Sequence, residues 1–438
     1  MALMDTTRAS APERELALDL YRSSAVILVV IGHWLLSVMT YRDGEFGRDN
    51  PLVLMPWTQW ITWGFQVVPV FFAVAGYASA VSWARRDAAT TRQEWIRRRV
   101  ARTLGPTGVY AGFMLVVMVV LMLAGIDGSV LELGGWAVAM HLWFLAVYLM
   151  VVTLTPVAVA AHQRFGLGAP AALAACLVVV DVIGIGAGHP EVRILNYFFC
   201  WAAIYQLGIA WHGALVRRRL LVAMAVVAAA ALPLLVTWGP YPIAMIGVPG
   251  DRVENSAPPS VALLALAAVQ IGLLLALVPM LNRALARGAW PRILTVANDN
   301  VMALYLWQML PVIVVTLIGY PTGLLPQPPL GSGAWWLARL EWELVLAVVT
   351  AGLLCLLYWG RRLFAAPVPT FNVPVTPVVG EALLYAGTAA CALALSLLSA
   401  DGFAPGGRLP VVATVLFAGG LLLVAARPSV VTTVPAQE

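Results

Sequence analysis

Arg22 and His33 are the side chains whose types and spacing most clearly suggest chemistry in this sequence. Both lie in the apolar run Leu18–Met39, which also contains Asp19. Ionisable groups at membrane depth are costly and are therefore candidates for function. Eleven residues make almost three helical turns, which places Arg22 and His33 on one helix face, roughly 16 Å apart. A guanidinium suits phosphate oxygens and an imidazole suits a general base, so the run predicts one path with these two ends.

The alternative for this helix is purely structural. His33 then hydrogen-bonds a neighbouring helix, and Arg22 anchors the helix at the membrane surface. Asp19 lies three residues before Arg22, close enough on a helix to pair with it. We assign Asp19, together with His33, to the candidate catalytic set.

The composition places these residues in a membrane protein. Of 438 residues, 61% are hydrophobic and 11% are charged, against about half and about a quarter in soluble proteins. The net charge of +5 comes from arginines in short loops between apolar runs, so no nucleic-acid binding is expected. The four cysteines lack metal-type spacing, and no metal site is expected.

The elements that must position the candidate residues are membrane-spanning helices, each of about 20 apolar residues. We predict an all-α polytopic membrane protein with a bundle of about twelve such helices. Their ranges are 18–40, 57–83, 104–125, 136–160, 170–187, 195–214, 220–238, 260–281, 296–318, 334–359, 378–400 and 410–426. The predicted divisions are an N-terminal segment 1–17, a core 18–362 of ten helices, a proline-rich linker 363–377, a C-terminal helix pair 378–426 and a tail 427–438.

Arginine placement predicts the orientation. With a cytoplasmic N-terminus, the inner segments carry 19 arginines and the outer segments carry 6. An even number of spans then puts both termini in the cytoplasm, in a bacterial-type cytoplasmic membrane. The loops are too short for a soluble catalytic domain, so any reaction takes place within the bundle or at its ends. The sequence gives no oligomeric state.

The run LDLYRSSAVILVVIGH resembles the opening helix of the membrane acyltransferase-3 family, in which Arg or Lys is followed by ten residues and His. Other stretches are similar to that family's motifs in the same order, over roughly residues 15–360. They are FFAVAGY at 71–77, the arginines Arg98, Arg99 and Arg102 with Pro106, HLWFL at 141–145, and Asn300 with YLWQ at 305–308. Three features differ from the family pattern: Ala75 replaces the usual Ser, Gln308 replaces the usual His, and Pro106 is displaced by about one residue.

The resemblance implies transfer of an acyl group from cytosolic acyl-CoA, most simply acetyl-CoA, to a hydroxyl. The acceptor would be a cell-envelope saccharide, a glycolipid or a glycosylated small molecule. His33 is then the general base; Arg98, Arg99 and Arg102 grip the CoA phosphates, and Arg22 guides the pantetheine arm inward. Acyl-CoA is a co-substrate, and no permanently bound cofactor is expected. The alternative for the arginine cluster is the positive-inside rule alone.

Four further residues are assigned to a substrate pocket. His141 and Trp143 begin one predicted helix, where they either line the acceptor entrance or belong to an interfacial aromatic belt. Tyr305 and Gln308 share a face of a later helix, after a polar cluster that either caps the helix or faces the donor. Gln308 can form hydrogen bonds but cannot titrate.

Two other functions stay open. In a proton-coupled transporter, His33 and Asp181 would carry protons, although we favour local pairing of Asp181, for example with Arg193. No paired, broken helices in matching halves support transport. A non-catalytic relative of the acyltransferases is the other alternative, suggested by Ala75 and Gln308.

Overall fold

Apolar helices make up most of the computed structural model, which describes residues 15–429. The longer helices are α1 (Leu16–Leu36), α4 (Val68–Ala84), α5 (Arg92–Leu123), α9 (Gly168–Asp181), α10 (Asn196–His212), α11 (Arg218–Thr237), α12 (Val261–Leu285), α13 (Trp290–Trp307), α15 (Gly333–Trp359), α17 (Pro377–Asp401) and α18 (Val411–Ala425). Five shorter α-helices are α6 (Gly128–Ala137), α7 (Trp143–Thr153), α8 (Thr155–Phe165), α14 (Met309–Gly319) and α16 (Arg361–Phe364).

The remaining elements are turns of helix and two small sheets. The short helices are α2 (Pro51–Leu54), α3 (Thr62–Phe65), the 3₁₀ segments η1 (Pro56–Ile61), η2 (Met140–Leu142), η4 (Pro190–Leu195) and η5 (Pro405–Gly407), and the π-helical η3 (Val182–Gly186). An antiparallel hairpin joins β1 (Val38–Arg42) to β2 (Glu45–Asp49), and β3 (Phe371–Val373) pairs in parallel with β4 (Ala426–Pro428).

The predicted all-α membrane fold is confirmed. Within residues 15–429, ten helical segments are long and apolar enough to span a membrane, or eleven if the bent pair α13–α14 is one span. Each of the twelve predicted segments contains a helix, but the last, α18, has 15 residues. At 1.5 Å per residue this helix is about 22 Å long, shorter than the roughly 30 Å hydrocarbon layer. The predicted terminal segments 1–17 and 427–438 lie largely outside the described residues.

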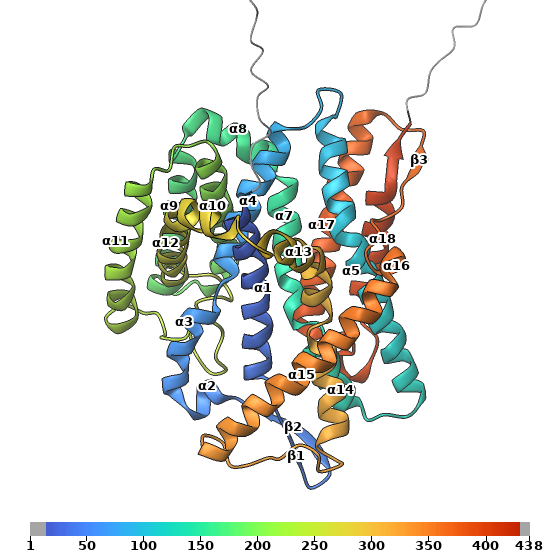
Figure 1. Ribbon diagram of the computed structural model, residues 1–438. Coiled ribbons are helices and arrows are strands. Elements are labelled where there is room, and N and C mark those ends of the chain that lie inside the picture. Colours follow the sequence, from blue (N-terminus) through green and yellow to red (C-terminus); the bar gives the residue numbers. More distant parts are fainter. Residues whose placement is uncertain (1–14, 430–438) are drawn as a thin grey trace, which may run out of the picture.

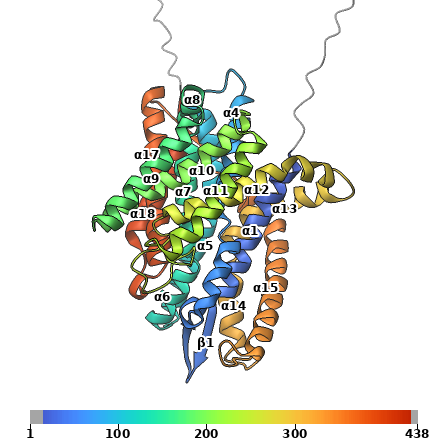
Figure 2. The same ribbon diagram turned by 90° about the vertical axis from the view of Figure 1, so that its left-hand side faces the viewer.

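The bundle has two distinct ends (Figure 1). We call the end at which α1 begins, near α8 and the β3–β4 pair, the terminal face. The opposite end, at which α1 ends and the β1–β2 hairpin lies, is the hairpin face. Figure 2 shows α1 beside α12, α13 and α15, with α17 and α18 on the other side of the bundle.

Local sequence explains where several helices begin and break. The hydroxyls of Thr91, Ser260, Ser332 and Thr376 cap α5, α12, α15 and α17 by accepting a backbone N–H three residues on. α13 and α14 meet at Gln308 with a bend of 53°. Pro311 explains this break, because its ring clashes with the carbonyl four residues earlier, at Trp307.

The C-terminal helix pair is built into the bundle rather than appended to it. The buried Arg97 of α5 donates hydrogen bonds to the carbonyls of Val424 in α18 and Gly380 at the start of α17. Arg92 pairs with Glu381 at 2.6 Å. α17 also packs against α7. The predicted linker 363–377 holds β3, and its residue Val368 donates to the Ala101 carbonyl.

Candidate active site

The His33 side chain is oriented by Gln308. Its Nδ1 lies 2.9 Å from Gln308 Oε1, and Gln308 Nε2 donates to the Tyr305 carbonyl at 2.9 Å. A carbonyl only accepts hydrogen bonds, so the Gln308 amide must direct its NH₂ group to Tyr305 and its oxygen to His33. Nδ1 of neutral His33 therefore carries the proton, and Nε2 keeps a lone pair. The bend at Gln308 is what brings this buried side chain to α1.

A second layer of contacts holds the end of α1. Trp34 Nε1 donates to the Gln308 carbonyl at 2.9 Å, and Trp342 Nε1 donates to the Trp34 carbonyl at 3.2 Å. Arg339, which is counted among the arginines of the outer side, is a buried residue of α15 that donates to the Ser37 carbonyl. Its guanidinium lies 5.0 Å from the Trp342 ring centre. These contacts fix the position of the His33 backbone relative to α13 and α15.

Arg22 occupies the other end of the same helix face. Its guanidinium donates to the Asn298 carbonyl of α13 at 3.2 Å, and Asn298 Nδ2 donates to the Asp19 carbonyl at 2.9 Å. Both Arg22 and His33 therefore contact α13, as their predicted shared face requires. Arg22 lies towards the terminal face and His33 towards the hairpin face.

The arginines of the α5 cluster have different environments. Arg99 donates to the Ser79 hydroxyl at 3.2 Å, and its guanidinium lies 4.7 Å from the Trp95 ring centre. Arg98 is bound to Glu94 at 2.8 Å, and Arg102 is exposed. All three lie at the terminal face, the same face as Arg22. Among them, Arg99 contacts α4, through Ser79 and Ala78.

The predicted substrate-pocket residues separate into two groups. Trp143 lines a cavity that also contains His33. His141 is buried behind this cavity, 5.1 Å from the Tyr305 ring centre, and Tyr305 donates to the His141 carbonyl. Tyr305 and Gln308 are likewise outside the lining. His141 therefore occupies neither of the two predicted positions: η2 turns its side chain into the bundle rather than to an interface, and it does not line the cavity.

An aromatic layer separates the two polar ends. Phe71 of α4 lies 4.8 Å from Phe144 of α7, and Phe144 lies 5.2 Å from Tyr305 of α13, between ring centres. Along α4, Phe71 comes between Val68, which lines the His33 cavity, and Ser79, which binds Arg99. These ring contacts join α4, α7 and α13 at a level between the terminal face and the His33 cavity.

The cavity at His33 has a volume of about 1230 Å³. We call it the hairpin-face cavity. Its wall combines His33 and Gly32 of α1 with residues of β2, α3, α7, the loop 238–260 and α17. Arg48, Asp49 and Asn50 supply polar groups at the hairpin face. The rest of the lining is largely apolar.

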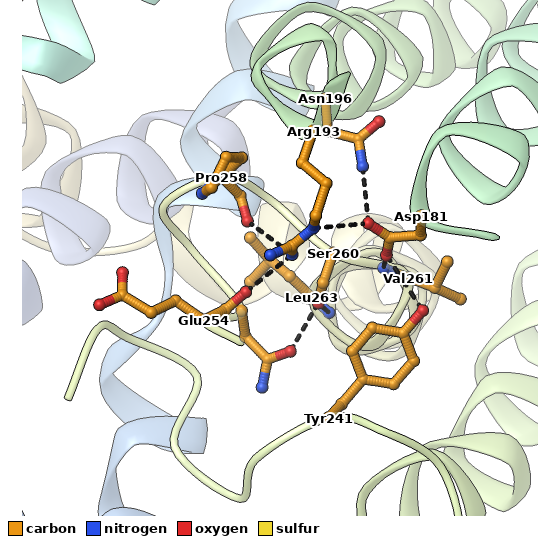
Figure 3. Close-up of polar contacts among 10 residues, drawn as sticks. Asp181, Arg193, Asn196, Tyr241, Glu254, Pro258, Ser260, Val261 and Leu263 are labelled. Carbon is orange, nitrogen blue, oxygen red and sulfur yellow. Dashed lines mark hydrogen bonds and ion pairs between the residues drawn. The ribbon is translucent and has the colours of Figure 1, made fainter. Parts of the chain in front are cut away.

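A buried ion pair fixes the loop 238–260, which forms part of this wall (Figure 3). Arg193 Nε lies 3.1 Å from Asp181 Oδ1, which confirms the predicted pairing. Arg193 also donates to the loop carbonyls of Glu254 and Pro258, at 3.0 and 3.3 Å. Tyr241 of the loop donates to Asp181 Oδ2 at 3.0 Å. Burial and the Asp181 charge raise the pKa of the Tyr241 hydroxyl, which keeps it protonated as a donor.

The same loop is bound to α3 and to the residue that follows it, Gln66. Trp63 Nε1 donates to the Ile243 carbonyl at 2.8 Å, and Gln66 Nε2 donates to the Met245 carbonyl at 3.0 Å. The neighbouring loop residues Ile246 and Gly247 line the cavity. The loop is therefore held from both sides.

Sequence reasoning missed Arg339, Trp342 and the cavity-lining part of α17. A signal existed for the first two, because tryptophans at 335, 336 and 342 surround Arg339 at helical spacing. α17 carried no comparable signal. Its composition is that of an ordinary spanning helix.

Comparison with known proteins identifies one family. The profile of a family described as an acyltransferase domain, the acyltransferase-3 domain, matches residues 15–360. Neither a curated protein nor a solved structure matches the chain. The match contains every candidate residue named above except those of α17 and α18.

Proposed function

Because the chain belongs to the acyltransferase-3 family of membrane acyltransferases, we propose that it transfers an acyl group from acyl-CoA to an acceptor hydroxyl, with His33 as general base. The observation that carries this proposal is the His33–Gln308 contact of 2.9 Å beside a cavity. It leaves Nε2 unprotonated, and that nitrogen can take the proton of a hydroxyl as the oxygen attacks the thioester carbonyl.

The donor is proposed to enter from the terminal face, which we infer is cytoplasmic. Arg22, Arg99 and Arg102 lie there, and guanidinium groups match phosphate oxygens. Arg98 contributes less, because Glu94 already neutralises it at 2.8 Å. The aromatic layer of Phe71, Phe144 and Tyr305 must part for a thioester to reach His33.

The acceptor is proposed to occupy the hairpin-face cavity, with its hydroxyl at His33. A saccharide or glycosylated molecule fits the polar groups at the cavity's edge, Arg48, Asp49 and Asn50. Attack forms a tetrahedral oxyanion; its collapse breaks the C–S bond, and the thiolate of CoA takes the proton from His33.

The transporter alternative loses its main support. Asp181 accepts from Arg193, Asn196, Tyr241 and the Val261 N–H, so its oxygens are engaged in a structural network.

The test is acyl-CoA turnover by the purified protein in lipid nanodiscs. Wild type should hydrolyse acetyl-CoA slowly without acceptor, and His33→Gln should lower that rate by about 100-fold or more. His189→Gln is the matched control, because His189 is exposed and pairs only with Glu191 at the surface. Equal rates for wild type and His33→Gln would contradict the role of His33.

A further inference from the structure

α7 and α17 pack together and both line the hairpin-face cavity, and we call the part of the cavity between these two helices its arm. This arm lies between α7 and α17, at the depth of the membrane-spanning helices. Ala146, Val147 and Met150 line it on the α7 side. Ala389, Ala392, Leu393, Ser396 and Ala400 line it on the α17 side. α17 begins at Pro377, beyond the residues that match the acyltransferase family.

The arm is open towards the surrounding bilayer. Ala389, Leu393, Ser396 and Ala400 are exposed and repeat at intervals of four, three and four residues, which places them on one face of α17. The exposed face of α15 carries larger side chains, which include Leu337, Leu340, Leu344 and Val348. Small residues leave a groove here, and the groove is continuous with the cavity at His33.

The side chains that line the arm indicate which kind of molecule it can bind. The hydroxyl side chains of this wall, Thr388, Ser396 and Ser399 of α17, already donate to backbone carbonyls. Most of a bare saccharide's hydroxyls would therefore lie against alkyl side chains without a partner, which is unfavourable. A hydrocarbon chain fits such a wall and gains from its burial. The cavity of about 1230 Å³ also exceeds the usual size of a pocket for a small polar molecule.

The hairpin-face end of the cavity adds a positive charge. Arg48 lines it, exposed, with its guanidinium 4.4 Å from the Trp136 ring centre. The neighbouring Asp49 is already paired with Arg42 at 3.0 Å. Arg48 is thus placed to bind an anionic head group whose chain descends between α7 and α17.

We propose that the acceptor is a membrane-embedded amphiphile, with an anionic, hydroxyl-bearing head group at Arg48 and His33 and a hydrocarbon chain between α7 and α17. This inference rests on the proposed acyltransfer for the fate of the hydroxyl. Binding of the amphiphile, however, needs no turnover. α17 is then a determinant of acceptor specificity supplied from outside the family domain.

The experiment is photocrosslinking in nanodiscs with phosphatidylglycerol that bears a diazirine in its acyl chain, mapped by mass spectrometry. We expect saturable crosslinks at residues 389–400 and 146–150, above those on the outward face of α15. Ala389→Leu should reduce them by at least about fivefold. Ala382→Leu is the matched control, because Ala382 is also exposed on α17 but does not line the cavity.

The role of the head group and the identity of the bound molecule are tested with separate probes. Arg48→Gln should weaken labelling by the phosphatidylglycerol probe and leave labelling by a phosphatidylcholine probe of the same chains unchanged. Equal labelling of α15 and α17, unaffected by Ala389→Leu, would overturn the proposal. Competition by palmitoyl-CoA but not by unlabelled phosphatidylglycerol would also overturn it, because the groove would then bind the acyl-CoA donor rather than the acceptor. Intact labelling without any acyl-CoA turnover would count against the proposed function alone.

Discussion

The Gln308 amide determines which nitrogen of His33 is available for chemistry. A neutral amide orients the imidazole as a carboxylate does in catalytic triads, but it adds no charge to stabilise an imidazolium. The family's usual His at this position could serve either as donor or as acceptor. Gln308 is limited to one arrangement by the Tyr305 carbonyl, to which its Nε2 donates.

Removing the Gln308 side-chain oxygen should impair acyl transfer without abolishing it. We expect Gln308→Leu to lower kcat by about tenfold, the value of one hydrogen bond. Gln308→Glu keeps an acceptor for Nδ1–H and should retain more activity than Gln308→Leu. Steady-state kinetics with acetyl-CoA measure both. A change in KM alone, at constant kcat, would show that Gln308 only packs against His33.

Neutralising Arg99 should weaken the binding of acyl-CoA, whereas neutralising Arg97 should lower the stability of the fold. Arg99→Gln removes an accessible guanidinium, so the KM for acyl-CoA should rise by about tenfold or more, with less difference at high salt. Arg97→Gln removes the donors to Val424 and Gly380, so it should lower the thermal unfolding temperature and leave KM unchanged. An unaltered KM for acyl-CoA in Arg99→Gln would indicate that Arg99 only helps to set the orientation of the protein in the membrane.

At the scale of elements, α4 and α10 are held together by reciprocal glycines. A Cβ added to Gly76 would lie 2.0 Å from the Tyr205 carbonyl oxygen, and one added to Gly208 would lie 2.0 Å from that of Ala73. Small residues let helices approach closely in a bilayer, where packing rather than hydrophobicity drives association. This contact sets the position of Phe71 and Phe72, and hence of the aromatic layer.

Gly208→Ala should therefore separate α4 from α10. We expect a loss of about 1–3 kcal/mol from overpacking, seen as a lower midpoint of thermal unfolding in detergent. Gly112→Ala in α5 is the control, because no atom lies within 4 Å of its added Cβ. Equal midpoints for the two variants would contradict the close α4–α10 contact.

At the scale of the molecule, residues far apart in the sequence enclose one cavity. α1, the loop 238–260 and α17 each contribute a wall. The Asp181–Arg193 pair holds the loop from the side of α9 and η4, and Thr62 holds it from α3 through its hydroxyl, which accepts from the Met245 N–H at 2.8 Å. Stability of the wall and shape of the cavity are therefore coupled.

Breaking the buried pair should destabilise the protein and alter the cavity together. Asp181→Leu leaves the Arg193 guanidinium buried and unpaired, which costs about 3–5 kcal/mol. Thermal unfolding should shift accordingly, and the KM for the acceptor should rise more than the KM for acyl-CoA. Glu191→Gln is the control, since its pair with His189 is exposed and contributes little. Unchanged unfolding in Asp181→Leu would contradict this account.

The sequence by itself determined the membrane class, nearly all spans, the shared face of Arg22 and His33 and the pairing of Asp181, because apolar runs, helical periodicity and buried charge are local properties. Only the tertiary structure decided that Gln308 reaches His33 across 275 positions, that His141 is buried, and that α17 lines the cavity. Those outcomes depend on the register between helices. Packing of small residues and long-range hydrogen bonds set that register, and neither can be read from a single helix.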